Sequence, residues 1–176
     1  MRYYFSVPIY ETVVDTESNS IQSEIVKFIQ KNKYSFRTSW GDPVYTTFNE
    51  FKNVIQDIPS LYHILLTHVK NYLNESDIPF GDIDIFESWV NVTRYNGYQK
   101  YHIHYLDECF ISGVYYFQTN GNDGDIVFNF LEDESTISFQ PEIGKIILFP
   151  SSTRHKVTKN TSGSDRISIA FNCKIL

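Results

Sequence analysis

Apolar residues in the first 80 positions recur at helical spacing in two segments. The first segment runs from Ile21 to the charged stretch ending at Lys33, and the second begins at Pro59 and ends before Asn74. Both segments predict amphipathic helices. A short apolar run from Tyr3 to Tyr10 predicts a strand, and Pro8 inside it places that strand at a sheet edge or a strand end.

After Pro79 the periodicity changes from helical spacing to short β-rich runs separated by Gly, Asn, Asp and Pro. Seven strands at such short spacing predict a sandwich or a barrel. The predicted strands are Ile83–Tyr95, Tyr101–His104, Cys109–Gln118, Asp125–Phe130, Thr136–Phe139, Lys145–Phe149 and Arg166–Lys174.

The chain is expected to form a single domain over residues 1–176. Residues 1–80 hold one strand and two helices, too little to bury a core separately, so they should pack outside a β core formed by residues 83–176. The segment Tyr34–Ile58 has no clear periodicity apart from a possible short helix near Glu50–Ile55. We expect a substrate-covering loop in this segment, because long loops often carry function.

Charge and composition exclude several classes of protein. Lys and Arg number 15 against 21 Asp and Glu, a net charge of −6, with no basic stripe to bind a phosphate backbone, so direct nucleic-acid binding is not expected. No apolar stretch is long enough to span a membrane. Only two cysteines are present, and residues 1–8 do not form a signal peptide, so we expect a cytoplasmic protein. The Tyr3–Tyr10 edge could pair across a homodimer.

Three of the five histidines suggest a metal site. His102 and His104 lie two residues apart on a predicted strand and should face the same side, and His155 follows another strand. Neutral imidazoles suit Fe, Zn, Cu and Ni, and three of them leave coordination positions open. Alternatively these are solvated strand residues, since a His-x-His pair arises by chance in roughly one such sequence in seven.

A carboxylate could complete this site. Glu108 lies four residues after His104, and His-x-His-x-x-x-Glu is a cupin-like ligand spacing. Alternatively, Asp107 and Glu108 form a polar turn between two strands.

Arg166 and Ser168 lie on one face of the last predicted strand. A guanidinium beside a hydroxyl can bind a carboxylate, with two donors from Arg166 and one from Ser168. If this strand lies beside the metal, Arg166 can hold the far end of a dicarboxylate whose near end chelates iron. The alternative is a surface arginine paired with Asp165 or another acid.

The order of these motifs resembles that of the small 2-oxoglutarate- and Fe(II)-dependent oxygenases of bacteria and phages, over about residues 85–174. The residues that carry the resemblance are Glu87-Ser88-Trp89-Val90-Asn91-Val92, Gly97, His102-Ile103-His104, Ser112-Gly113-Val114-Tyr115-Tyr116, Gly124, Pro141-x-x-Gly144, Leu148-Phe149-Pro150-Ser151, His155-x-Val157 and Arg166-Ile167-Ser168-Ile169-Ala170-Phe171-Asn172.

The resemblance implies a double-stranded β-helix, a jelly-roll or cupin-like barrel that is mainly β with helices packed outside. It implies Fe(II) held by His102, His104 and His155, and 2-oxoglutarate bound through Arg166 and Ser168. The superfamily's usual metal motif is His-x-Asp/Glu…His, so His104 stands where a carboxylate is usual. A third imidazole in its place makes the metal site more positive.

Further candidates for cofactor or substrate contacts lie on the same predicted strands, where they could equally be sheet-packing residues. They are Tyr116, Asn91, Tyr101, Trp89 and Asn172.

The leading functional hypothesis is a 2-oxoglutarate-dependent dioxygenase that uses O2, most simply a hydroxylase of unknown substrate. A first alternative is a cupin-like metalloenzyme that does not use 2-oxoglutarate and has no need of Arg166. A second alternative is a non-catalytic β-rich binding or structural module, which would bind no stoichiometric metal.

Overall fold

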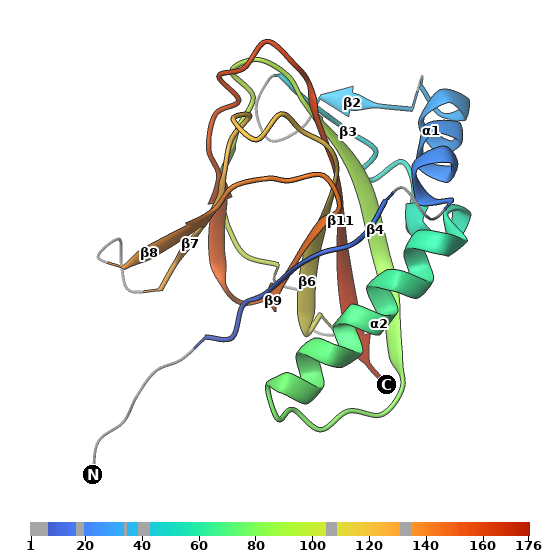
Figure 1. Cartoon of the computed structure of the whole chain (residues 1–176), viewed down its shortest axis with the longest axis vertical. Helices are drawn as coiled ribbons and strands as arrows, with labels where there is room; N and C mark the ends of the chain where they lie inside the picture. The colour runs from blue at the N-terminus through green and yellow to red at the C-terminus, as the bar shows by residue number, and fades with distance from the viewer. Residues whose placement is uncertain (1–6, 17–19, 34, 39–42, 105–108, 131–134) are drawn as a thin grey trace.

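The chain folds into two antiparallel β-sheets packed against each other, with two helices on the outside of the larger sheet (Figure 1). The computed structural model describes residues 7–16, 20–33, 35–38, 43–104, 109–130 and 135–176. The predicted architecture, mainly β with helices outside, is confirmed.

The larger sheet has seven strands in the order β1-β9-β6-β11-β4-β3-β2. At its centre the two longest strands, β11 and β4, pair from Arg166 opposite Thr93 to Ile175 opposite Ile83. In sheet order the strands are β1 (Tyr10–Val13), β9 (Lys145–Pro150), β6 (Ile111–Gln118), β11 (Arg166–Ile175), β4 (Ile83–Thr93), β3 (Val44–Thr46) and β2 (Arg37–Thr38).

The smaller sheet has four strands in the order β5-β10-β7-β8. They are β5 (Gln99–His102), β10 (Arg154–Val157), β7 (Ile126–Asn129) and β8 (Thr136–Phe139). Apolar side chains of both sheets meet in a small core made of Tyr116, Ile126, Phe128, Ile147 and Phe149. This core joins the two sheets, and three of its residues, Tyr116, Ile126 and Phe149, also line a cavity.

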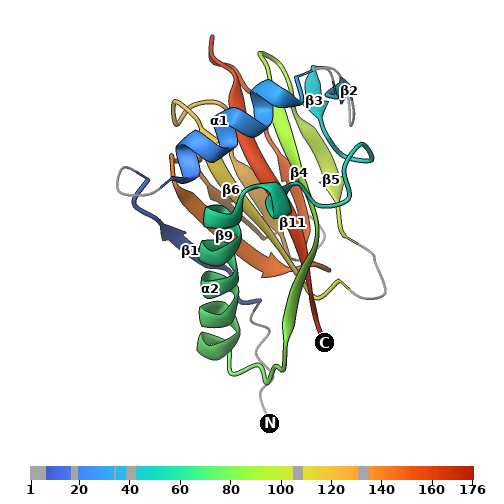
Figure 2. The same ribbon diagram turned by 90° about the vertical axis from the view of Figure 1, so that its right-hand side faces the viewer.

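The helices cover the opposite face of the larger sheet (Figure 2). Helix α1 (Ile21–Lys31) and helix α2 (Pro59–Glu75) bury the apolar positions that their periodicity predicted, and a 3-10 helix, η1 (Val54–Asp57), precedes α2. In α2, Leu61, Leu65, Val69 and Leu73 are fully buried, because residues four apart lie on the same side of a helix.

Several predicted boundaries need correction. Of the predicted strand Tyr3–Tyr10, residues 3–6 lie outside the described residues and residues 7–9 are not in a strand, while a strand begins at Tyr10. Segment 34–58 is less irregular than expected, since it contributes β2, β3 and η1. Residues 1–80 were expected to pack outside the β core, but they also contribute strands to it. Strand β1 pairs with β9 and β3 pairs with β4, so residues 1–80 and 83–176 form one sheet together.

Strand β10 is missing from the sequence prediction, which placed His155 beyond a strand. Its residues are Arg154, His155, Lys156 and Val157, so no apolar alternation marks it. It forms because β5 and β7 both pair with it, on either side. No helix in the described part of the chain is long and apolar enough to cross a membrane.

Candidate metal centre and cofactor pocket

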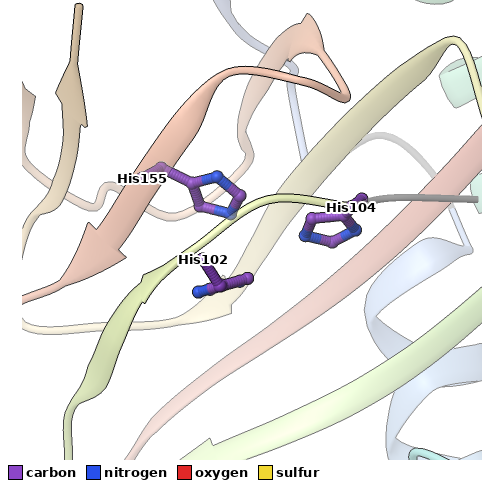
Figure 3. A group of neighbouring side chains, drawn as sticks. All are labelled: His102, His104 and His155. Carbon is purple, nitrogen blue, oxygen red and sulfur yellow. The ribbon is translucent and has the colours of Figure 1, made fainter. Parts of the chain in front are cut away.

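The three predicted histidines meet at one place on the smaller sheet (Figure 3). His102 ends β5 and lies directly opposite His155 of β10. His104 follows two residues later, and its backbone N–H donates to the carbonyl oxygen of Ser151 at 3.0 Å. One ring nitrogen of each histidine lies within 4.8 Å of the other two, so the three imidazoles can contact one metal ion.

Backbone carbonyls fix the tautomers of two of these rings. Nδ1 of His102 lies 2.8 Å from the carbonyl oxygen of Lys100, and Nδ1 of His155 lies 2.9 Å from that of Thr153. A carbonyl oxygen only accepts, so each Nδ1 must carry the proton. Nε2 of each ring therefore keeps its lone pair for a metal.

A side-chain amide fixes the third ring. Nδ1 of His104 lies 2.9 Å from Oδ1 of Asn172 on β11. The orientation of this amide is set because its Nδ2 donates to Oε2 of Glu87 at 2.7 Å, and the hydroxyl of Ser112 donates to its Oδ1 at 2.8 Å. His104 therefore also presents an unprotonated Nε2.

Burial keeps these rings neutral. It lowers the pKa of His104 to about 4 and that of His155 to about 3, and it lowers the pKa of His102 as well. The neighbouring His102 ring also lowers the pKa of His104 and of His155, and His104 lowers that of His155. Uncharged imidazole is the form that binds a metal, so the three residues fit a divalent transition metal such as Fe(II).

No carboxylate joins the cluster within the described residues. Asp107 and Glu108, which the cupin-like spacing singles out, lie outside the described residues. The ligand set that the described part of the chain offers is therefore three neutral imidazoles.

A cavity of about 670 Å³ adjoins the histidines and lies along the centre of the larger sheet. Its wall is built from alternate residues of two paired strands, since every second side chain of a strand faces the same way. On β4 these are Glu87, Trp89, Asn91 and Thr93, and opposite them on β11 lie Asn172, Ala170, Ser168 and Arg166. The prediction that Arg166 and Ser168 share a face is confirmed.

Arg166 is 3% exposed, so its interpretation as a surface residue is wrong. Its Nη1 donates to the carbonyl oxygens of Asp123 and Gly124, at 3.0 and 2.6 Å, and its Nη2 donates to Oγ1 of Thr93 at 3.1 Å. The other candidate partner, Asp165, instead forms an ion pair with Arg94 at 3.7 Å.

One N–H donor of the Arg166 guanidinium has no acceptor among the described residues. Its Nε is buried without a hydrogen-bond partner among the described residues, and no ion pair to it is formed there. Asp123 and Asp125 interact electrostatically with the guanidinium, but neither forms a direct ion pair with it. A buried cation is stabilised by direct pairing, and an anion bound in the cavity can provide it, which fits a dicarboxylate.

The other predicted cofactor contacts differ in their positions. Ser168, Tyr116 and Asn91 are buried and line the cavity, and Oδ1 of Asn91 has no partner among the described residues. Tyr101 borders the cavity, but its ring packs against the Arg154 guanidinium at 4.2 Å. Arg154 precedes His155 on β10 and faces the other side of the sheet, so cofactor contact by Tyr101 stays a prediction.

Aromatic residues shape the rest of the site. The Trp89 ring stacks near His104, with 5.9 Å between ring centroids, and Phe48 packs edge-on against Trp89 at 5.0 Å. Sequence reasoning did not select Phe48 or Tyr98, which also line the cavity. Glu87 was part of a quoted motif but was assigned no role. It lies on the same face of β4 as Trp89 and Asn91.

Comparisons with known proteins agree with this geometry. Residues 129–172 match a family model described as "Putative 2OG-Fe(II) oxygenase", which confirms the resemblance that the sequence indicated. This segment includes His155, Arg166, Ser168 and Asn172. No curated protein matches the chain in sequence.

Solved structures share the fold over nearly all of the chain. A prolyl-4-hydroxylase from Pseudomonas putida is 13% identical with a TM-score of 0.67, covering 96% of this chain and 92% of that one. A prolyl hydroxylase from Trichoplax adhaerens, solved with a hypoxia inducible factor peptide, is 11% identical with a TM-score of 0.66, covering 95% and 83%. The carbocyclase SnoK from nogalamycin biosynthesis is 12% identical with a TM-score of 0.70, covering 95% and 79%.

The predicted double-stranded β-helix is therefore confirmed. The family match over residues 129–172 and the shared fold make this chain similar to the 2-oxoglutarate- and Fe(II)-dependent oxygenases.

Proposed function

We propose that this protein is a non-haem Fe(II) oxygenase in which His102, His104 and His155 hold the metal and Arg166 binds the far carboxylate of 2-oxoglutarate. The observation that carries the proposal is that one cavity is bordered by three imidazoles with available Nε2 atoms and by a buried guanidinium without an ion-pair partner among the described residues.

Bound Fe(II) and 2-oxoglutarate would supply O2 activation coupled to oxidative decarboxylation of 2-oxoglutarate to succinate and CO2, with hydroxylation of a substrate. His102, His104 and His155 would hold the metal, and three protein ligands would leave coordination positions for 2-oxoglutarate and O2. Arg166 lines the cavity, so its guanidinium would donate to the far carboxylate. Ser168 and Tyr116 are buried and line the same cavity, so their hydroxyls can donate to the same group.

Part of the cavity wall is aromatic. Trp89 and Phe48 pack beside His104, and a wall that limits water near the metal would strengthen the electrostatic interactions there. Phe48 belongs to segment 34–58, which supports our assignment of that segment as the cover over the substrate.

The proposal also covers the cellular location, the source and the oligomeric state of the protein. Cys109 and Cys173 are free, which supports a reducing cytoplasm, and the resemblance supports a bacterial or phage source. Strand β1 lies at the edge of the larger sheet, where a second copy of the chain could pair to form a homodimer.

An anaerobic titration tests the function. Metal-free protein receives Fe(II) and then 2-oxoglutarate, and the visible charge-transfer band of the chelate is recorded. The wild type should bind one Fe(II) and develop the band, while His104→Ala should lose Fe(II). Arg166→Lys keeps the charge but loses the planar set of donors. It should bind Fe(II) normally and weaken 2-oxoglutarate binding by about 10–100-fold, the effect of a lost charged hydrogen bond.

Arg94→Lys is the matched control, because it makes the same change at an exposed arginine outside the cavity. Fe(II) binding without the band would favour the cupin-like alternative. A protein that binds no metal would leave only the non-catalytic alternative.

A further inference from the structure

The three candidate metal ligands differ in the group that contacts Nδ1 of each imidazole. Backbone carbonyls fix His102 and His155, and these groups carry no net charge. His104 alone among the three is fixed by a side chain, Asn172, whose other end binds the carboxylate of Glu87.

We propose that Glu87 is a positioning residue that acts on the bound metal through Asn172 and His104, and that its carboxylate, two hydrogen bonds from His104, supplies the negative charge absent from the three-histidine ligand set. The inference rests on the proposed function in so far as it needs a metal at these histidines. It does not require 2-oxoglutarate.

Hydrogen bonds connect Glu87 to Asn172 and Asn172 to His104, and we call this chain of contacts the relay. Glu87 of β4 and Asn172 of β11 are register partners in the centre of the larger sheet. Oε2 of Glu87 accepts from Nδ2 of Asn172 at 2.7 Å, and Oδ1 of Asn172 lies 2.9 Å from Nδ1 of His104. Hydrogen-bonded partners behind a metal-binding histidine orient its ring and increase its basicity.

No other group among the described residues uses the Glu87 carboxylate. Its one hydrogen bond there is to Asn172, and no ion pair with a lysine or arginine is formed. The side chain is half-buried and borders the cavity. No lysine or arginine among the described residues neutralises this charge, which adds to the effect of burial in raising the pKa of Cys109.

Glu87 does not serve as a ligand in this arrangement. Its carboxylate lies on the Nδ1 side of His104, beyond Asn172, whereas the metal would bind Nε2. No carboxylate oxygen joins the three imidazole nitrogens in the described cluster. Its effect on the metal must therefore pass through His104.

A negative charge at this position should favour a more positive metal centre. It should strengthen binding of a divalent ion and stabilise Fe(III) relative to Fe(II). A merely orienting role would need the hydrogen bond to Asn172 but not the charge. Glu87→Gln separates the two, because its amide oxygen can still accept from Nδ2 of Asn172.

The experiment uses Fe(II) alone, without 2-oxoglutarate. The Fe(II) dissociation constant is measured anaerobically by chelator competition, and the Fe(III)/Fe(II) midpoint potential by redox titration. Glu87→Gln should weaken Fe(II) binding by about tenfold and shift the potential to more positive values. Asp84→Asn removes the same charge from the same strand, where Asp84 instead contacts Lys174, and should match the wild type.

A double-mutant cycle with Asn172→Ala tests the route. In the Asn172→Ala background, Glu87→Gln should change affinity and potential much less than in the wild type. Equal effects in both backgrounds would overturn the relay. A Glu87→Gln variant with the wild-type affinity and potential would overturn the role of the charge.

Failure of the proposed function is distinguishable from failure of this inference. If the wild type binds Fe(II) but forms no 2-oxoglutarate chelate, the proposed oxygenase is wrong while the Glu87 comparison still decides the relay. If the wild type binds no Fe(II), both proposals are overturned.

Discussion

At the scale of single residues, the candidate site follows from short-range spacing where spacing is sufficient. His102 and His104 could be placed side by side because residues two apart on a strand face the same way. Arg166 could not be distinguished from a surface residue by sequence alone. Its burial depends on Asp123, Gly124 and Thr93, which only the folded sheet brings to it.

Glu87 is the clearest omission. Its effect depends on Asn172, 85 residues away along the chain, and sequence spacing carries no information about that pairing. The sequence shows that Glu87, Trp89 and Asn91 face the same side of a strand. It does not show which residue of another strand the Glu87 side chain contacts.

A titratable residue outside the site gives a residue-scale prediction. Burial lowers the pKa of His68 on α2, whose Nδ1 lies 2.8 Å from the Tyr10 hydroxyl. As pH falls below about 6.5, the unfolded chain takes up a proton at this residue before the folded chain does, so stability is lost. The test range runs from about pH 7.5 to about pH 5.5, one unit above and one below the ordinary histidine pKa. Over this range the free energy of unfolding should fall less for His68→Gln than for the wild type.

The measurement is urea unfolding of metal-free protein across this pH range. His63→Gln, at an exposed position of the same helix, is the matched control. The same pH dependence in both variants would contradict the assignment to His68.

At the scale of secondary structure, strands with strong apolar alternation were predictable and polar ones were not. The strand Thr136–Phe139 has its predicted bounds, and β9 and β11 extend one residue beyond theirs. Strand β10 was missed because its stability comes from pairing on both edges and not from its own pattern. Strand β3 was missed for a related reason, since three residues are too few to show a period.

Close packing of β6 between its neighbours gives an element-scale prediction. A Cβ on Gly113 would overlap Phe171 of β11 and would lie 2.7 Å from Cδ2 of Leu148 on β9. Gly113→Ala should therefore lower the free energy of unfolding by about 1–3 kcal/mol, as overpacking does. Urea denaturation measures this change.

Gly163→Ala provides the control, because a Cβ there meets nothing within 4 Å. It should change stability by less than about 0.5 kcal/mol. Comparable losses for the two variants would show that the packing around Gly113 is not tight.

At the scale of the whole molecule, the helices and the site occupy opposite faces of one sheet. The helix-side core contains most of the buried apolar residues, and the smaller core joins the two sheets beside the cavity. The two parts of the chain, divided near residue 80, share the larger sheet through β1 and β3. A metal at the three histidines would connect the smaller sheet to the larger one through Asn172.

Metal binding should therefore stabilise the folded molecule. With Fe(II) at about 100 times its dissociation constant, the free energy of unfolding should rise by about 2.7 kcal/mol. Anaerobic urea unfolding with and without Fe(II) measures the gain. His155→Ala should abolish it, whereas His63→Ala, outside the site, should retain it. An equal gain in both variants would place the metal elsewhere.

The sequence by itself determined both helices, most strands and the shared faces of His102 with His104 and of Arg166 with Ser168. These features follow from periodicity, which is a local property of the backbone. The order of motifs along the chain, through the resemblance to a known family, implied the double-stranded β-helix and the grouping of His155 with the other two histidines. Tertiary structure decided the pairing of His102 with His155, the burial of Arg166 and the chain of contacts from Glu87 to His104. Each of these needs a partner from a distant strand, and strand pairing is not encoded in the spacing of residues along one segment.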